Sequence, residues 1–182
     1  MTMQINSAHL TVECVKGDIA NQPDMDAVVN AANAWLQPGS GVAGAIHKAA
    51  GPGLEEECRA LAPIAPGQAV ITAAHGLPNR YVIHCLGPIY GKDEPSDELL
   101  ASCYRSAMKL ADDKQLTCVA FPAISTGVFG YPIEPAARVA FLTLLALADQ
   151  LRWVRRVRFV LFSNEDLSAH ERVLKKVGND SG

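Results

Sequence analysis

The sequence predicts an α/β sandwich built on a central sheet, and three observations support this prediction. Segments typical of strands alternate with segments typical of helices along the chain. Several strand segments are apolar throughout, as expected for a sheet that is covered on both faces. The length of 182 residues suits one domain, and an apolar content of 49% can supply a sizeable core. We therefore predict a single domain over residues 1–182, with a frayed tail at 178–182.

The strand segments are rich in valine, isoleucine and phenylalanine and are bounded by glycine, proline, asparagine or aspartate. They cover residues 10–17, 26–32, 68–74, 80–87, 117–123 and 156–163. The stretch RWVRRVR at 152–158 is basic, and we interpret it as a solvated edge.

Helix segments fall between these strands. One begins near Val42, and the segment at 54–61 continues or follows it. The segment at 96–113 has Ser96 as a suitable N-cap and acidic residues in its first turn. The segment at 134–151 is apolar nearly all round and should be well covered, and a last helix is expected at 168–177 with Ser168 as its cap.

Composition excludes several classes of protein. A net charge of −3 does not favour binding to nucleic acid or to an anionic membrane. No apolar run approaches the ~18 residues of a membrane span, and the N-terminus has no signal-peptide pattern. The five cysteines form no CxxC pair, which predicts reduced thiols in a cytoplasmic protein. Histidine and cysteine show none of the usual ligand spacings, so we expect neither a metal nor a cofactor.

Two glycine-rich loops carry the strongest functional signal. QPGSGVAGAIH follows the strand segment at 26–32, and AISTGVFGYP follows the strand segment at 117–123; each precedes a helix. Glycine lets main-chain N–H groups approach a ligand closely, and a helix N-terminus adds roughly half a positive charge. Neither loop contains lysine or arginine before its helix. Two such loops at neighbouring strand ends predict a seat for two phosphates.

Other interpretations of these loops fit less well. Gly39, Gly41 and Gly44 match GxGxxG, the pattern of a nicotinamide oxidoreductase, but residues 34–38 separate the match from the strand. Ser125 resembles the nucleophile of a serine hydrolase, although Ala123 replaces the first glycine of GxSxG. His84 lies within a strand segment and is interpreted as structural.

Four ordered motifs resemble the macrodomain family, in particular its MacroD-type branch. They are NAAN, the glycine-rich loop, GAIHKAAG and FPAISTGVFGYP, and VKGDI and FSNED fit the same pattern. The resemblance covers roughly residues 12–176. It implies a three-layer α/β/α sandwich with a mixed central sheet and a cleft for ADP-ribose. It also implies hydrolysis of O-acetyl-ADP-ribose, a deacetylase reaction, and removal of mono-ADP-ribose from acidic side chains of proteins.

The resemblance also implies roles for individual residues. Asp18 would accept a hydrogen bond from the adenine amine, with the Ile19 amide beside it and Phe162 against the ring. The residues that would hold the diphosphate are Gly41, Val42, Ser125, Thr126, Gly127, Val128 and Phe129. Asn33 would bind the distal ribose, with Asn30 nearby and Phe129 against the sugar. His47 is a candidate for orienting water there, or is a packed core imidazole.

Ala43 departs from the pattern of the resemblance. MacroD-type sequences usually have GVDGAIH, whereas this chain has GVAGAIH, and the missing aspartate is thought to orient or activate water. One interpretation is that the chain only binds ADP-ribose, as a reader module. The other is that the substrate's own diphosphate holds the water, because viral macrodomains commonly have GVAGA and many hydrolyse ADP-ribosyl esters.

Overall fold

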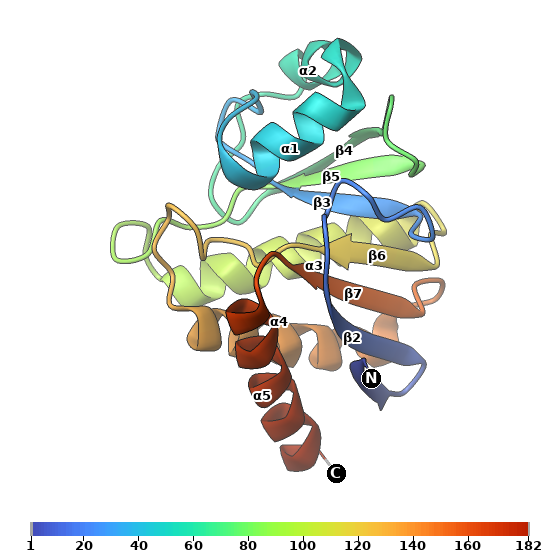
Figure 1. The fold of residues 1–182 in the computed structure, drawn as a ribbon, viewed down its shortest axis with the longest axis vertical. Coiled ribbons are helices and arrows are strands. Elements are labelled where there is room, and N and C mark those ends of the chain that lie inside the picture. The colour runs from blue at the N-terminus through green and yellow to red at the C-terminus, as the bar shows by residue number, and fades with distance from the viewer. Residues whose placement is uncertain (1, 182) are drawn as a thin grey trace.

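The computed structural model describes residues 2–181, which form a seven-stranded sheet with helices on both faces (Figure 1). The elements are β1 (Met3–Ser7), β2 (Leu10–Lys16), β3 (Ala27–Ala31), α1 (Gly41–Ala50), α2 (Pro52–Arg59), β4 (Ala69–Ala73), β5 (Tyr81–Cys85), α3 (Ser96–Asp113), β6 (Cys118–Phe121), α4 (Ile133–Leu147), a 3-10 turn (Ala148–Gln150), β7 (Arg156–Leu161) and α5 (Asn164–Asp180). No helix of the described chain combines the length and apolar composition needed to cross a membrane.

The order of strands in the sheet is β1-β2-β7-β6-β3-β5-β4. The central strands β2, β7, β6, β3 and β5 are parallel, and β1 and β4 pair antiparallel at the two edges. The sheet is therefore mixed, as predicted. The parallel strands all end on one edge, which lies at the left of Figure 1, and their connecting loops gather there.

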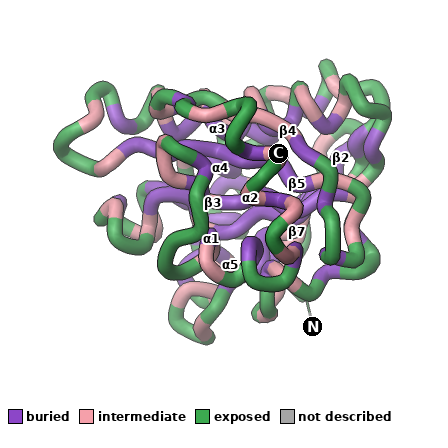
Figure 2. Tube along the Cα trace, turned by 90° about the horizontal axis from the view of Figure 1, so that it is seen from above, coloured by how far each residue is buried: buried purple, intermediate pink, exposed green. Residues whose placement is uncertain are grey.

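Two apolar clusters, one on each face of the sheet, hold a layer of helices against each face and so give three layers. The larger cluster joins one face to α3, α4 and α5 and contains Phe121, Phe141 and Phe159. The smaller cluster joins the other face to α1 and α2 and contains Ile46 and Leu54. Figure 2 shows buried backbone running through the centre of the molecule and exposed backbone in the peripheral loops. The predicted α/β/α sandwich is confirmed.

The structure confirms the predicted strands and corrects several details. Edge strand β1 was missed, because MQINS is largely polar and its side chains are only partly buried. The prediction that Ser168 caps the last helix is wrong: α5 begins at Asn164, and the Ser163 side chain accepts a hydrogen bond from the Asp166 amide. Ser96 is the first residue of α3 and not its cap, and its hydroxyl donates to the Asp93 carbonyl at 2.5 Å.

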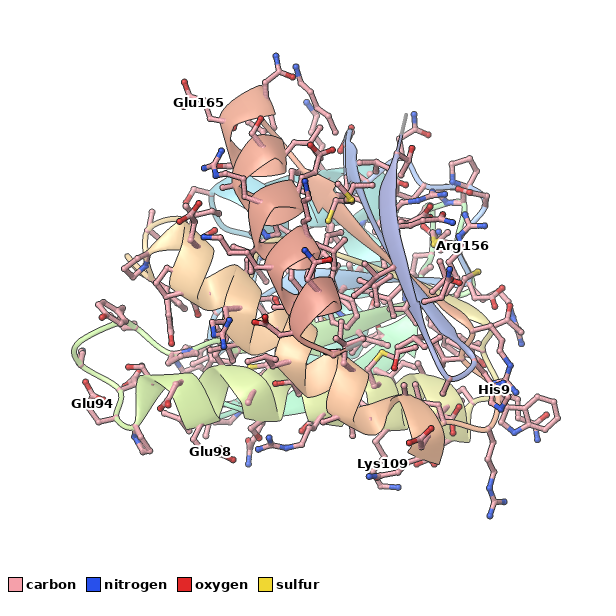
Figure 3. All side chains as sticks on the ribbon, turned by 90° about the horizontal axis from the view of Figure 1, so that it is seen from below. His9, Glu94, Glu98, Lys109, Arg156 and Glu165 are labelled. Atoms are coloured by element: carbon pink, nitrogen blue, oxygen red, sulfur yellow. The ribbon has the colours of Figure 1, made fainter. Side chains whose placement is uncertain are left out.

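The tail and the basic stretch also differ from expectation. Helix α5 continues to Asp180, within the segment expected to fray, and Gly182 lies outside the described residues. The basic stretch is not simply a solvated edge, because β7 lies between β2 and β6. Arg156 and Arg158 form ion pairs with Glu13 and Asp24, and the Arg158 side chain is only 14% exposed. Figure 3 shows Arg156 on the side of the molecule remote from Glu165 and the start of α5.

Candidate functional site

A cavity of about 600 Å³ opens at the carboxyl ends of the parallel strands. Its lining residues come from four separate segments of the chain and are Lys16, Gly17, Asp18, Ile19, Gly41, Val42, Ala45, Pro122, Val160 and Phe162. It brings together five of the residues predicted for the site, namely Asp18, Ile19, Gly41, Val42 and Phe162. The predicted residues Asn33 and 125–129 lie outside this lining.

Asp18 is held by the turn that follows β2. One carboxylate oxygen of Asp18 accepts a hydrogen bond from the Ala20 amide at 2.9 Å, and its carbonyl accepts from the Gln22 side chain at 2.9 Å. Gln22 is itself buried and accepts from Arg158 at 2.9 Å. The second carboxylate oxygen of Asp18 and the Ile19 amide have no protein partner among residues 2–181. The turn therefore presents one acceptor and one donor side by side.

Apolar side chains line the cavity next to the Asp18 oxygen and the Ile19 amide. Phe162 follows β7 directly and is 91% exposed, so its ring contributes to no core cluster. Ile19 and Val160 are buried in the smaller cluster and reach the same cavity. An exposed ring over a buried apolar floor provides a surface on which a planar base can stack.

The N-terminus of α1 faces the cavity without a cap. Ser40 occupies the N-cap position, but its side chain accepts no hydrogen bond from the helix, and the first turn contains no acidic residue. The amides of Gly41, Val42 and Ala43 therefore have no protein acceptor in the described chain. Gly41 has φ +61°, a conformation that glycine adopts without steric penalty. The helix end offers N–H donors and a positive partial charge to an anion.

The second glycine loop follows β6, the strand paired with β3. Within it, Thr126 and Gly130 donate to carbonyls of the same loop, and Tyr131 donates to the Ser125 carbonyl at 2.9 Å. The amides of Ser125, Gly127, Val128 and Phe129 have no acceptor within residues 2–181. Because β3 and β6 are adjacent and parallel, this row of free amides and the α1 N-terminus lie at the same edge of the sheet.

Ser125 sets the shape of this loop. It has φ +67°, an uncommon conformation for a residue with a side chain, and it is buried with no partner for its hydroxyl. A Cβ added to Gly87, which follows β5, would lie 2.1 Å from the Ser125 Oγ. The strained residue thus packs against a position without a side chain, and the unpaired amides of the loop begin at Ser125 itself.

Asn33 lies in the loop between β3 and α1 and is tied to it. Its side-chain nitrogen donates to the Gln37 carbonyl at 2.8 Å, and its side-chain oxygen accepts from the Gln37 amide at 3.0 Å. A Cβ added to Gly39 would lie 3.5 Å from the Asn33 nitrogen and 3.9 Å from the Ala43 Cβ. Asn33 and Ala43 therefore both neighbour Gly39.

Asn30 and His47 lie deeper than the cleft. Asn30 is fully buried, and its side-chain nitrogen lies 3.1 Å from Nδ1 of His84. His47 is 5% exposed, neither of its ring nitrogens has a partner, and burial lowers its pKa despite the nearby Glu55. Asn30 on β3 and His47 on the buried face of α1 thus lie outside the lining of the cavity, and their predicted catalytic roles stay predictions.

Some cleft residues were not predicted. Lys16, Gly17, Ala45, Pro122 and Val160 line the cavity because they neighbour the motif residues in the fold. Lys16 and Gly17 lie at the end of β2, Ala45 lies in α1, Pro122 follows β6 and Val160 is near the end of β7, so their positions next to the motifs offered a signal. Gly87 packs against Ser125, and the Gln22 side chain donates to the Asp18 carbonyl, so both stabilise the site without lining the cavity. No sequence pattern predicted a role for either residue.

The fold and this cleft define the class of protein. The macro domain family matches residues 29–140 of the chain, more than half of its length, so the chain belongs to the macro domain family. The family is the one that the sequence motifs resemble.

Particular relatives make the assignment more specific. A macro domain-containing protein of Chlorobaculum tepidum, CT2219, is 44% identical over 167 residues, which are 91% of this chain and 96% of that protein. The ADP-ribose glycohydrolase MACROD2 of Xenopus laevis is 45% identical over 174 residues, covering 94% of this chain and 41% of that protein. A macrodomain of Oceanobacillus iheyensis solved with ADP has a TM-score of 0.94 at 39% identity, covering 99% of this chain and 98% of that one. A glycine-to-valine variant of that macrodomain was solved with ADPR.

Proposed function

We propose that this chain binds ADP-ribose in the cleft and hydrolyses O-acetyl-ADP-ribose and ADP-ribosyl esters on acidic protein side chains. The observation that carries the proposal is a set of unpaired main-chain amides at the ends of two adjacent parallel strands, β3 and β6. The relatives support it, because one is a glycohydrolase for ADP-ribose and another was solved with ADPR.

Main-chain donors are sufficient for a useful affinity. Three or four N–H bonds to charged phosphate oxygens, at ~1.5–3 kcal/mol each, contribute about 5–12 kcal/mol before ordering costs. Stacking of the adenine on Phe162 adds ~1–3 kcal/mol. Micromolar binding requires about 8 kcal/mol, so the proposed contacts reach that range. Lys16 is the one basic side chain in the cavity lining, and it is exposed.

The unpaired groups also fit adenine recognition. The free Asp18 oxygen accepts from an exocyclic amine, and the adjacent Ile19 amide donates to a ring nitrogen. This arrangement selects adenine over guanine, because guanine presents a carbonyl where adenine presents the amine. Mono-ADP-ribosylated proteins are the proposed macromolecular partners.

Hydrolysis without an acid at position 43 requires another way to place water. In the proposed reaction, the diphosphate held by the two loops orients a water molecule toward the ester, while Asn33 fixes the distal ribose. Positioning of this kind contributes several kcal/mol when the geometry is right. An ester needs less assistance than an amide, which matches a site with a neutral Ala43.

Binding is tested at Gly127, because a Cβ there would meet no atom within 4 Å. Calorimetry with ADP-ribose should give binding heat for the wild type and for Gly127→Ala. Gly127→Glu places a carboxylate in the proposed phosphate seat and should give none. Equal binding by all three proteins would show that the anion is held elsewhere.

Catalysis is tested with O-acetyl-ADP-ribose and with a glutamate-ADP-ribosylated protein. We expect slow turnover by the wild type, strong loss in Asn33→Ala and faster turnover in Ala43→Asp, whose carboxylate would extend from the first turn of α1 near Gly39. Buried Ala43 next to Gly39 also supports a second function, a reader that binds ADP-ribose without chemistry. No wild-type turnover together with gained turnover in Ala43→Asp would establish the reader.

A further inference from the structure

A chain of polar side chains runs through the otherwise apolar cluster beneath α1 and α2. His84 on β5 is at its centre and is fully buried. Its Nδ1 lies 3.1 Å from the side-chain nitrogen of Asn30 on β3, and its Nε2 lies 3.0 Å from the hydroxyl of Thr72 on β4. The Cys58 sulfur of α2 lies 3.8 Å from the same Nε2. The three sheet residues point to the same face, because Asn30 and Val70 are both paired with His84 and Thr72 is two residues beyond Val70 on β4.

The Thr72 hydroxyl bears on which nitrogen of His84 carries the proton. Its single hydrogen has two acceptors within reach, the Ala73 carbonyl and Nε2 of His84, each at 3.0 Å. When the hydroxyl donates to the carbonyl, its oxygen accepts from His84, which requires N–H at Nε2. Burial lowers the pKa of His84 to about 3, so the ring is neutral and Nδ1 has a lone pair.

The protonation of His84 then orients Asn30. A lone pair on Nδ1 accepts from an amide N–H, so the Asn30 side-chain nitrogen faces the imidazole and its oxygen is the free end. That oxygen is buried and has no partner within the described chain, and the same is true of both ring nitrogens of His47. The ring centroids of His47 and His84 are 6.4 Å apart, so the two imidazoles are close neighbours. A neutral His47 has one N–H, which complements a free acceptor on Asn30.

We propose that His84 is a positioning residue: as the Nε2–H tautomer set by Thr72, it holds the nitrogen of Asn30 toward its own ring. The oxygen of Asn30, and not the nitrogen, is then the free polar atom of the buried layer that also contains His47. Asn33 is three residues beyond Asn30, and Ala43, which like Asn33 lies near Gly39, is one helical turn before His47. The effect on turnover rests on the proposed hydrolase function, whereas the tautomer does not.

The tautomer is measured directly by two-bond ¹H–¹⁵N correlation spectra of the imidazoles at neutral pH. The His84 signals are assigned by their loss in His84→Asn. We expect Nε2–H in the wild type and a mixture of tautomers in Thr72→Val, which removes the hydroxyl acceptor with little change in shape. A wild-type ring protonated at Nδ1 would overturn the proposal, whether or not the protein is an enzyme.

The matched variants Thr72→Val and Thr72→Ser separate positioning from packing. Valine keeps the volume and loses the hydroxyl, whereas serine keeps the hydroxyl and loses a methyl group from a residue that is 2% exposed. Positioning predicts that kcat for O-acetyl-ADP-ribose falls about tenfold or more in Thr72→Val, with KM and ADP-ribose affinity nearly unchanged, and recovers in Thr72→Ser. A purely structural role predicts the reverse order of the two variants.

The outcomes for the two proposals are distinguishable. A wild type that binds ADP-ribose but shows no turnover refutes hydrolysis, and the spectra of the wild type and Thr72→Val still decide the tautomer. A wild type with turnover, an Nε2–H ring and unchanged kcat in Thr72→Val refutes the positioning role alone.

Discussion

Replacement of Gly87 by alanine should weaken ADP-ribose binding from a position outside the cavity lining. The added Cβ would lie 2.1 Å from the Ser125 Oγ, 2.6 Å from the Ile124 Cγ2 and 3.3 Å from the Ser125 Cβ. Ordinary contacts of this kind are about 3.5 Å, so a shift on the order of 1 Å is required. Ser125 is buried, and a rotation of its hydroxyl would still leave the contact with Ile124. The loop that carries the free amides must therefore move.

The size of the effect follows from hydrogen-bond geometry. An N–H···O bond is best near 2.9 Å and is lost by about 3.5 Å, so a shift of this size removes one or two of the phosphate contacts. At ~1.5–3 kcal/mol for each bond to a charged oxygen, the loss of one contact raises Kd roughly tenfold to a hundredfold or somewhat more. The expected change at Gly87 is thus comparable to the loss of a residue that touches the ligand.

Calorimetry with ADP-ribose measures this change, and thermal unfolding monitors the fold of each variant. The control is the double variant Gly87→Ala with Ser125→Gly, which removes two of the three overlaps and tolerates the positive φ at position 125. It should bind more tightly than Gly87→Ala alone, so the two changes should couple. Wild-type affinity in a folded Gly87→Ala protein would refute the role assigned to the 125–129 loop.

Three other predictions use side chains. Lys16→Ala should raise Kd for ADP-ribose less than about fivefold, and less still at high salt, because Lys16 is exposed; calorimetry at two salt concentrations checks this. The hydrogen bond from Arg158 lowers the pKa of Asp24 to about 2, so its contribution to stability is present above pH ~4 and is lost between pH ~4 and 2; urea unfolding of Asp24→Asn should lack this loss. Burial lowers the pKa of His84 to about 3, so only the unfolded chain gains that proton below pH ~6.5. The free energy of unfolding should therefore fall from pH ~6.5 toward 3, by up to about 1.4 kcal/mol per pH unit from His84, and His84→Asn should reduce the slope.

The sequence predicted the elements that carry periodic or continuous apolar patterns. Strands β2 to β7 were all found in this way, from continuous apolar runs such as that of β5 or from the alternation of β2. Strand β1 was missed because MQINS has only two apolar residues; edge position alone is not the reason, since edge strand β4 was found. The start of α5 was misplaced because both Ser163 and Ser168 are suitable N-caps. The prediction overlooked Asp166, an acidic residue three positions after Ser163, which favours Ser163 as the cap. The order of strands depends on tertiary packing, and no local pattern specified it.

The candidate site was predictable to the extent that it consists of local motifs. The turn at Asp18, the start of α1 and the exposed Phe162 meet in one cavity, as the motifs indicated. The burial of Asn30 was not predictable, because alternation along β3 gives its face only relative to the neighbouring strands. The two hydrogen bonds between the Asn33 side chain and the Gln37 main chain were equally unpredictable, since they depend on the conformation of an irregular loop.

When an anion is bound by main-chain amides, the residues that hold the backbone in place are more restricted in type than the residues that carry the amides. Any residue except proline supplies an N–H, so the residues that line the seat matter less than those that fix its backbone. Gly44 illustrates this, because a Cβ there would lie 2.3 Å from the Gly39 carbonyl oxygen and would push the first glycine loop away from α1. Gly87 does the same for the second loop. We therefore expect a chain with net charge −3 to hold the proposed diphosphate through these amides, and we expect substitutions at Gly44 and Gly87 to weaken binding although neither residue lines the cavity.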